Sequence, residues 1–473
     1  METKTAQGKK IYRKVRSISC LLVFMCLVYL PGNAWSMISV GEEKEIGARL
    51  LRQVETQAPL LNDPEIVAWV TGAGREVLDV VGTTYFDFRF FVIRDDAMNA
   101  FAMPGGIVVV HSGLIEGIDS KNELVCILAH EIGHVQGRHV ARRMDQMKVV
   151  NIGTALLAIA GMFLGGDASS AILTGSLAMN QSLALKYSRS DEEEADRRAM
   201  QWICEAGYDP MGLVTSLRKM KRNQWMGSQE IPSYLSTHPG SSQRITYIEE
   251  QAALHPCKQR KREDPVTLKR FQVKIKNMSH NPRMMLRYYK EQLARQPDDM
   301  FALYGYALAC FSARNYDESI KYFDRLIKLH PDIDGFITDR ASAFFAAGMY
   351  RKVIDILEKY RQKRNDPMAD YYIGRSYLET GMPEHALKEF LPLVQEWPFS
   401  EQLMFQTGRA CAAAGRRGEA HYYFYKYYSM INNNEIAAYH RRKALRLLPE
   451  HSPLRRKIGS GEETKDHPGA KRG

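Results

Sequence analysis

The sequence predicts a mostly helical chain with two folded parts, an α+β domain with a small sheet and an all-α solenoid of repeats after it. Residues 39–255 mix apolar helical stretches with a short apolar run that follows a Pro-Gly-Gly turn. Residues 287–450 carry helical periodicity and a repeat of 34 residues. A length of 473 residues agrees with this division, because domains average roughly 100–200 residues.

The composition excludes several classes of protein. Gly 34, Pro 19 and Cys 7 are ordinary counts for this length. They exclude a collagen, a wholly disordered chain and a disulfide-rich miniprotein. The net charge of +11 suggests nucleic acid or a membrane surface as a partner. However, the basic runs lie in the N-terminal leader, a linker at 256–286 and a tail, so we expect no nucleic-acid partner.

The first 36 residues resemble a secretory leader. Six Lys and Arg precede a 13-residue apolar run, Ile18 to Leu30, and the small-x-small triplet ends at Ser36. This order is typical of a signal peptide cleaved after Ser36. The alternative is an uncleaved anchor, but a bilayer span needs about 20 apolar residues. We therefore predict an exported protein whose mature chain has a charge of +6.

Five cysteines remain after the leader, and none forms a Cys-x-x-Cys motif. A zinc knuckle is therefore excluded. In an oxidising compartment one pair can form a disulfide, and we predict Cys204 with Cys257. Cys126, Cys310 and Cys411 occupy apolar helical positions and are expected to be buried thiols.

The C-terminal part contains the repeat. Gly374, Ala386 and Phe390 recur 34 residues later as Gly408, Ala420 and Phe424. A small residue, a glycine turn, Ala-x-x-x-Phe and a closing proline resemble the tetratricopeptide repeat, in which the aromatic fills the gap between successive helix pairs. The expected repeats are 300–331, 334–367, 367–398 and 401–433. They lie in a domain at 287–454 that is followed by a disordered tail at 455–473.

The first part, residues 37–255, contains His130-Glu131-Ile132-Gly133-His134. On a helix, positions i and i+4 place both imidazoles on one face, which suits two bonds to zinc. Glu131 is rotated away from this face and can act on a water molecule as a general base. We therefore expect one Zn²⁺ per chain.

Spacing alone does not identify the third zinc ligand. Val140 stands where a metzincin has its third histidine, and His139 is one position early, off the ligand face. An acidic helix start offers Glu192, with Asp196 on the same face in a supporting role. Spacing alone leaves Glu193 and Glu194 as competing ligands.

These motifs together resemble the HtpX- and BepA-type family of zinc metallopeptidases, which includes the CAAX prenyl protease. The resemblance covers most of residues 39–250. It implies a zincin-like metalloprotease fold, selects Glu192 as the third ligand and gives Asp196 the supporting role. The motifs that carry it are the segment Asn99–Gly106, the H-E-x-x-H helix, Tyr187-Ser188-Arg189, Glu192-x-x-Ala195-Asp196 and Ser236-Thr237-His238-Pro239 with Arg244-Ile245.

The resemblance also implies roles for residues outside the zinc motif. His238 is expected near the metal, as a fourth ligand or a stabiliser of the oxyanion, with help from Arg244. The apolar run after Pro104 is expected to be an edge strand that pairs with an extended peptide. The alternative is an internal core strand. The expected substrate-binding residues are Gly105, Gly106, Ile107, Val108 and Val109.

Residues 149–185 hold two uncharged stretches that are separated only by Asp167. Each is long enough to span a membrane, but glycines and polar residues interrupt both. We therefore predict a helical hairpin that covers the active site or contacts a membrane peripherally, with true membrane spans as the alternative.

These features predict an exported zinc endopeptidase. The resemblance implies that it acts in the periplasm of the bacterial cell envelope and hydrolyses misassembled envelope or outer-membrane proteins. The repeats would recruit the substrate or a partner, and the resemblance implies the outer-membrane protein assembly machinery as that partner. The alternative function is an assembly chaperone or adaptor that acts mainly through protein binding by the repeats.

Overall fold

The computed structural model describes residues 38–57, 59–146, 187–226, 233–254, 257, 261, 264–363, 366–397, 400–431 and 433–459. The predicted leader at 1–36 and the predicted hairpin at 149–185 lie outside these ranges. No helix within the ranges is long and apolar enough to cross a membrane.

The first part contains a three-stranded sheet with the order β1-β3-β2. The strands are β1 (Arg89–Ile93), β2 (Ala100–Met103) and β3 (Ile107–His111). β3 pairs in parallel with β1 and antiparallel with β2. Every residue of β3 is buried, as expected for a strand with neighbours on both sides and helices on its faces.

The expectation that the run after Pro104 is an edge strand is therefore wrong. β3 is the central strand, so the backbone of Ile107, Val108 and Val109 is already paired with strands on both sides. The turn before it contains Gly105 and Gly106, with φ of +83° and +87°. These values are accessible to glycine with little strain, and they let the chain reverse from β2 into β3.

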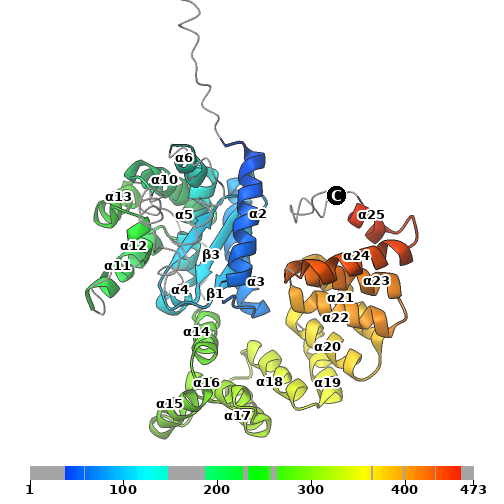
Figure 1. Cartoon of the computed structure of the whole chain (residues 1–473). Coiled ribbons are helices and arrows are strands. Elements are labelled where there is room, and N and C mark those ends of the chain that lie inside the picture. Colours follow the sequence, from blue (N-terminus) through cyan, green and yellow to red (C-terminus); the bar gives the residue numbers. More distant parts are fainter. Residues whose placement is uncertain are drawn as a thin grey trace, which may run out of the picture. The chain divides into compact units, whose positions relative to one another are not determined.

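Helices surround the sheet, and α5 lies at their centre (Figure 1). α5 is buried on all sides from Asn122 to Val135, and it packs against α3, α10, α11 and β2. The helices of the first part are α2 (Val40–Gln57), α3 (Pro64–Val81), α4 (Ser112–Gly117), α5 (Lys121–Gln136), α6 (His139–Gln146), α10 (Arg189–Glu205), α11 (Met211–Met226), α12 (Ser233–Thr237) and α13 (Ser241–Leu254).

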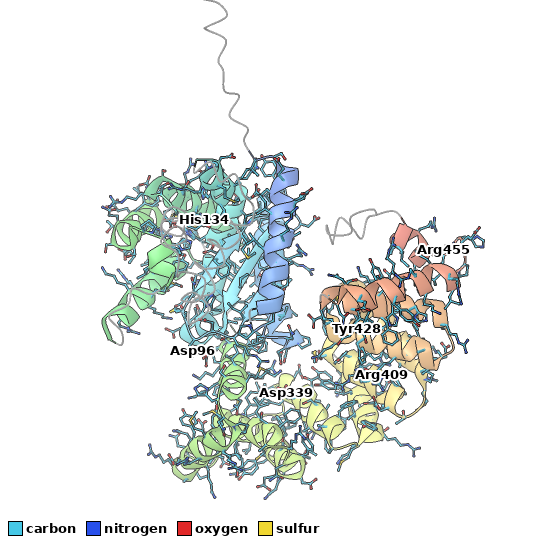
Figure 2. All side chains as sticks on the ribbon, in the orientation of Figure 1. Asp96, His134, Asp339, Arg409, Tyr428 and Arg455 are labelled. Atoms are coloured by element: carbon cyan, nitrogen blue, oxygen red, sulfur yellow. A yellow bond between two sulfur atoms is a disulfide. The ribbon has the colours of Figure 1, made fainter. Side chains whose placement is uncertain are left out.

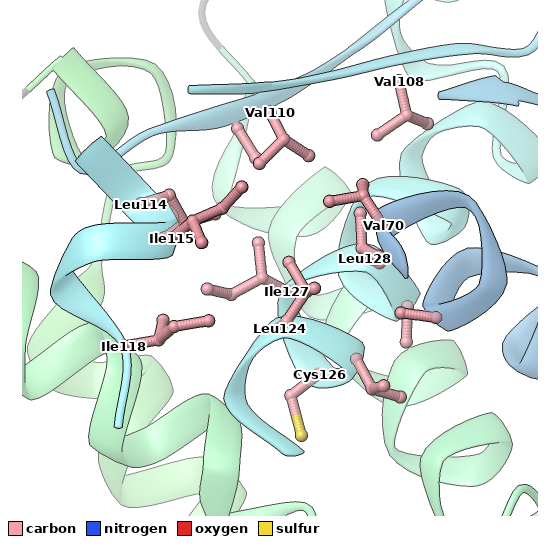
Figure 3. Packing of buried hydrophobic residues seen from close by; sticks show 14 of the residues in the cluster. Val70, Val108, Val110, Leu114, Ile115, Ile118, Leu124, Cys126, Ile127 and Leu128 are labelled. Atoms are coloured by element: carbon pink, nitrogen blue, oxygen red, sulfur yellow. The ribbon is translucent and has the colours of Figure 1, made fainter. Parts of the chain in front are cut away.

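The core of this part joins the sheet to α5 (Figure 3). Val108 and Val110 of β3 point towards Leu124 and Leu128 of α5, and all four are completely buried. Burial of an aliphatic side chain of this size stabilises a fold by roughly 1.5–3 kcal/mol. This packing fixes the helix that carries the H-E-x-x-H motif.

The predicted linker at 256–286 is partly wrong, because it contains α14 (Pro265–Ser279) and the start of α15 (Pro282–Arg295). Asp264 caps α14, and Leu268 and Phe271 are buried in the core of the first part. Two of its cations, Arg270 and Lys274, are also buried and form ion pairs. Basic residues that looked solvated therefore belong to a packed helix.

The repeats follow as antiparallel helix pairs, and the four predicted pairs are confirmed. The glycine and aromatic positions meet as expected, since a Cβ on Gly374 would lie 2.6 Å from the Phe390 ring. The helices are α16 (Met300–Ser312), α17 (Tyr316–Leu329), α18 (Gly335–Ala346), α19 (Tyr350–Arg361), α20 (Pro367–Glu379), α21 (Pro383–Glu396), α22 (Glu401–Ala413), α23 (Arg417–Met430), α24 (Asn434–Leu447) and α25 (Pro453–Gly459).

Two smaller expectations have different outcomes. The predicted disulfide between Cys204 and Cys257 is present, and Cys126, Cys310 and Cys411 are buried free thiols as expected. The predicted tail at 455–473 begins too early, because α25 continues to Gly459 and buries Ile458.

Candidate metal centre

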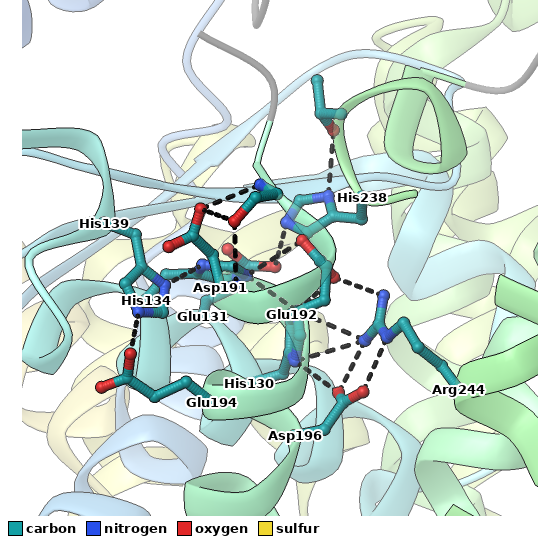
Figure 4. Close-up of polar contacts among 12 residues, drawn as sticks. His130, Glu131, His134, His139, Asp191, Glu192, Glu194, Asp196, His238 and Arg244 are labelled. Atoms are coloured by element: carbon teal, nitrogen blue, oxygen red, sulfur yellow. Dashed lines mark hydrogen bonds and ion pairs between the residues drawn. The ribbon is translucent and has the colours of Figure 1, made fainter. Parts of the chain in front are cut away.

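The H-E-x-x-H motif lies in the buried second half of α5. Ser120 caps the helix by accepting a hydrogen bond from the Glu123 N–H. His130 and His134 stand one turn apart, and their Nε2 atoms approach to 3.0 Å (Figure 4). Both rings and the Glu131 side chain are at most 1% exposed. Local helix geometry therefore aims two imidazole nitrogens at one point inside the protein.

α10 brings the acidic cluster to this point. A capping box of Ser188 and Asp191 starts the helix, and Glu192 follows in its first turn. The Glu192 carboxylate lies 3.5 Å from Nε2 of His130 and 3.6 Å from Nε2 of His134. Among the three glutamates left open by spacing, only Glu192 faces both histidines.

The other two glutamates of the cluster face elsewhere. Glu193 is exposed, and Glu194 turns towards His139, with 3.2 Å between its Oε2 and the ring Nε2. The difference follows from the helix, because successive residues are rotated by about 100°.

His238 completes the group. Its Nδ1 lies 2.9 Å from the Thr237 hydroxyl and 3.2 Å from the Tyr234 carbonyl oxygen, and its ring stacks on Tyr234. Its Nε2 lies 3.7 Å from a Glu131 oxygen and has no hydrogen-bond partner among the described residues. One ligand atom from each of His130, His134, Glu192 and His238 lies within 4.8 Å of the others.

Asp196 and Arg244 lie beside this group and contact its members. The family resemblance implies a supporting role for both. Asp196 lies 2.9 Å from Nδ1 of His130, so the other ring nitrogen points into the cluster. Arg244 of α13 pairs with Asp196 through two contacts of 2.7 Å and with Glu192 at 2.6 Å. A buried guanidinium thus fixes two carboxylates in place.

The same burial changes the proton affinities of the site. Burial raises the pKa of Glu131 to about 8, although the charges of His130 and Arg244 oppose it. Burial and the Arg244 charge lower the pKa of His130, but hydrogen bonds to Asp196 and Glu192 outweigh them and raise it to about 9. Protons therefore compete with a cation for these side chains, and cation binding releases them.

The donor set fits a zinc ion. Two imidazoles and a carboxylate are the ligands that catalytic zinc takes in proteins, with one position left for water or substrate. The unpartnered Nε2 of His238 is a buried polar atom that a cation in this group would satisfy. The arrangement suits a single transition-metal ion held at one end of α5.

Two residues of the site, His139 and Tyr187, had no role predicted from the sequence, although Tyr187 belongs to a motif that carries the family resemblance. His139 lies under His134, with 2.7 Å between their Nδ1 atoms, although its spacing excluded it as a ligand. Tyr187 stacks on His134 with 3.8 Å between ring centroids. Both depend on how separate segments meet, and the only local signal was the glycine at 137, which leaves room for the His139 ring.

The edge strand of the sheet that packs against α5 is β2, and all four of its residues are buried. His111 donates its N–H to the Asn99 carbonyl, so alternate residues of β2 pair with β3 and Ala102 turns its N–H away from β3. That N–H lies close enough to Glu131 to lower its pKa in part.

Comparison with known proteins gives a family for this region. Residues 65–252 match the model for "Peptidase family M48", and residues 286–332 match a model for "Tetratricopeptide repeat". The first range contains every residue of the cluster described above.

Several curated relatives are similar to the chain. It is 30% identical over 364 residues to the "Beta-barrel assembly-enhancing protease" of Escherichia coli (strain K12), an alignment that covers 75% of this chain and 73% of that protein. It is 32% identical over 182 residues to the "Mitochondrial metalloendopeptidase OMA1" of Schizosaccharomyces pombe, covering 38% and 52%. It is 30% identical over 172 residues to the "Metalloprotease LoiP" of E. coli, covering 35% and 62%.

Proposed function

We propose, on the premise that this chain belongs to peptidase family M48, that the cluster at the end of α5 holds one zinc ion and cleaves internal peptide bonds. His130, His134 and Glu192 would bind the ion. The observation that carries this assignment is the convergence of their ligand atoms with that of His238 within 4.8 Å. Zinc would supply Lewis-acid polarisation of the scissile carbonyl and of the attacking water.

Glu131 is the proton carrier in this mechanism. It follows His130 directly on α5, so it reaches the same space without occupying a ligand position. It takes a proton from the attacking water and then gives it to the leaving amine. Burial raises the pKa of this carboxyl group, which favours the second half of the transfer, the return of the proton to the amine. The positive charge of a bound cation would lower that pKa and so favour the first half.

We propose that the substrate binds as an extended strand along β2. The Ala102 N–H points away from β3 and towards the Glu131 carboxylate, and a peptide carbonyl would have to take the place of that carboxylate to pair with it. A peptide paired there would place its next bond beside the cluster. This assignment replaces the one at Gly105, Gly106, Ile107, Val108 and Val109.

His238 would control access to the last metal position. Its Nε2 faces the cluster and the ring is completely buried. With its Nε2 in this position, His238 would occupy the space that a substrate carbonyl needs. A shift of α12 would remove it, after which its N–H can stabilise the developing oxyanion.

The place of action is also a proposal. The predicted leader and the disulfide both fit an oxidising compartment, which for a bacterial envelope protein is the periplasm. The name of the E. coli relative refers to assembly of β-barrel proteins. We therefore infer that the substrates are misassembled outer-membrane proteins and that the repeats recruit them or their assembly machinery. The alternative remains an adaptor that acts through the repeats.

The test compares purified full-length Glu131→Gln with wild type. Glutamine keeps the size of the side chain but cannot carry the proton. Zinc content should stay at one per chain, while cleavage of denatured casein and of an unfolded β-barrel protein should fall by about 10²–10⁴-fold. Glu193→Gln is the matched control, because Glu193 is exposed, and it should retain full activity.

A cellular test separates the two functions. Glu131→Gln expressed in place of wild type should fail to restore outer-membrane protein assembly if proteolysis is the main role. Full restoration by this variant would establish the adaptor function instead. Retained cleavage in the pure preparation would refute the role of Glu131.

A further inference from the structure

We propose that His139 and Glu194 form a positioning relay that holds the metal-binding nitrogen of His134 in place. The inference rests on the metal site proposed above and adds two residues that belong to neither the H-E-x-x-H motif nor the predicted ligands. His139 acts through His134 and contributes no ligand atom to the cluster.

His134, His139 and Glu194 are joined by two successive polar contacts. Nδ1 of His134 lies 2.7 Å from Nδ1 of His139, and Nε2 of His139 lies 3.2 Å from Oε2 of Glu194 (Figure 4). The two rings are nearly perpendicular, at 80°, and both are at most 1% exposed. Water is therefore excluded from the contact between the two rings, whereas the Glu194 side chain is 24% exposed.

Only one arrangement of protons satisfies all these contacts when His134 binds a cation. Its Nε2 lone pair is then used, so its Nδ1 carries the proton and donates it to His139. Nδ1 of His139 must accept, and its proton must sit on Nε2, where the Glu194 carboxylate accepts it. Glu194 thus selects the His139 tautomer, and His139 selects the His134 tautomer that leaves Nε2 free for the metal.

The chain turns sharply between α5 and α6 in order to place His139 there. A Cβ on Gly137 would lie 2.2 Å from Nε2 of His139, so this position must be a glycine while the ring stays where it is. The next residue, Arg138, has φ of +51°. Such a conformation is unfavourable for a side-chain residue and persists only where the surroundings impose it.

Three ion pairs hold this turn and the end of the relay. Arg138 pairs at 2.7 Å with Glu43 of α2, which is only 2% exposed. Glu194 is fixed by Arg142 at 2.8 Å and by Arg198 at 2.7 Å. The relay therefore ends in a carboxylate whose position is set by residues of α6 and α10.

The experiment measures zinc affinity of the metal-free full-length protein by competition with a chromophoric chelator. His139→Phe fills the same space without an acceptor and should weaken zinc binding by about 10–100-fold. His139→Asn should recover part of this loss, because its amide oxygen can accept from His134. Glu194→Gln should weaken binding less than His139→Phe, and Glu193→Gln should not change it.

A second readout separates positioning from general stability. The visible absorption spectrum of the Co²⁺-loaded protein reports ligand geometry, and it should change in His139→Phe while the melting temperature of the metal-free protein does not. If His139→Phe fails to fold, the pair His139→Asn and Glu194→Gln decides by the same affinities and spectra.

The outcomes distinguish this inference from the proposed function. Wild-type affinity and a wild-type Co²⁺ spectrum in the His139 and Glu194 variants would overturn the relay and leave the metal site intact. Failure of the wild-type protein to bind zinc or cobalt would instead refute the metal site on which the relay rests.

Discussion

Glu65 should stabilise the fold through a buried ionic cluster, and Glu65→Gln tests how much. The Glu65 carboxylate pairs with Arg270 and Lys274 of α14, and both cations also pair with Asp339 of α18. Asp339 is labelled in Figure 2. The exchange keeps the shape of the side chain and removes its charge. In this variant Arg270 still pairs with Asp339, and Lys274 still pairs with Asp339 and Asp63. Neither cation is therefore left without a carboxylate partner.

The expected loss of unfolding free energy follows from the pKa of Glu65. Burial alone would raise the pKa of Glu65, but the charges of Lys274 and Arg270 outweigh it and lower the value from 4.5 to about 2. A difference of this size corresponds to about 3 kcal/mol. Because the side chain is 23% exposed, solvent screening reduces the expected loss to about 2 kcal/mol.

The sign of the pH dependence is also determined. A carboxyl group whose pKa is lower in the folded state stabilises that state fully above its unfolded value of 4.5. The stabilisation is lost as the pH falls from about 4.5 to 2. The free-energy difference between wild type and Glu65→Gln should therefore be largest at pH 7 and fall by more than half at pH 3.

Urea unfolding followed by tryptophan fluorescence measures this difference. Trp69 of α3 packs on Phe271 of α14, with 5.3 Å between ring centroids, and reports on this contact. The matched control is Glu45→Gln, since Glu45 is 62% exposed and its pair with Arg49 at 4.0 Å should contribute below about 0.5 kcal/mol. Equal losses at pH 7 and pH 3, or no loss at pH 7, would refute the electrostatic account.

Three further predictions concern the site and the disulfide. His238→Ala should alter the rate of cleavage yet bind zinc, because three ligands remain; unchanged kinetics would remove His238 from the mechanism. Dialysis against a chelator should abolish cleavage and added Zn²⁺ should restore it, whereas activity that survives verified metal removal would contradict a metal-dependent reaction. Replacing Cys204 and Cys257 together by serine opens a link across 53 residues and should cost about 4 kcal/mol, seen as a lower urea midpoint than in a Cys310→Ser control.

Features that depend on local spacing could be predicted from the sequence. The H-E-x-x-H spacing places His130 and His134 on one helix face in any setting, because α-helix geometry is local. The 34-residue period predicted all four helix pairs for the same reason, since each repeat packs only on its neighbours.

Other features depended on contacts that spacing does not contain. An apolar run of five residues fits both an edge strand and a central one, and only the pairing of β3 with β1 and β2 decided between them. Arg270 and Lys274 suggested a solvated linker, because their carboxylate partners lie far away in the sequence, on α3 and α18.

The sequence by itself determined the chemistry of this protein, which is a two-histidine, one-glutamate centre joined to a repeat scaffold. The tertiary structure decided which of three adjacent glutamates faces that centre and which strands lie at the edges of the sheet. It also placed His139 in contact with Nδ1 of His134. The physical reason is that ligand type follows from residue identity and helical phase. Orientation and support depend instead on how α5, α10 and α13 pack against one another.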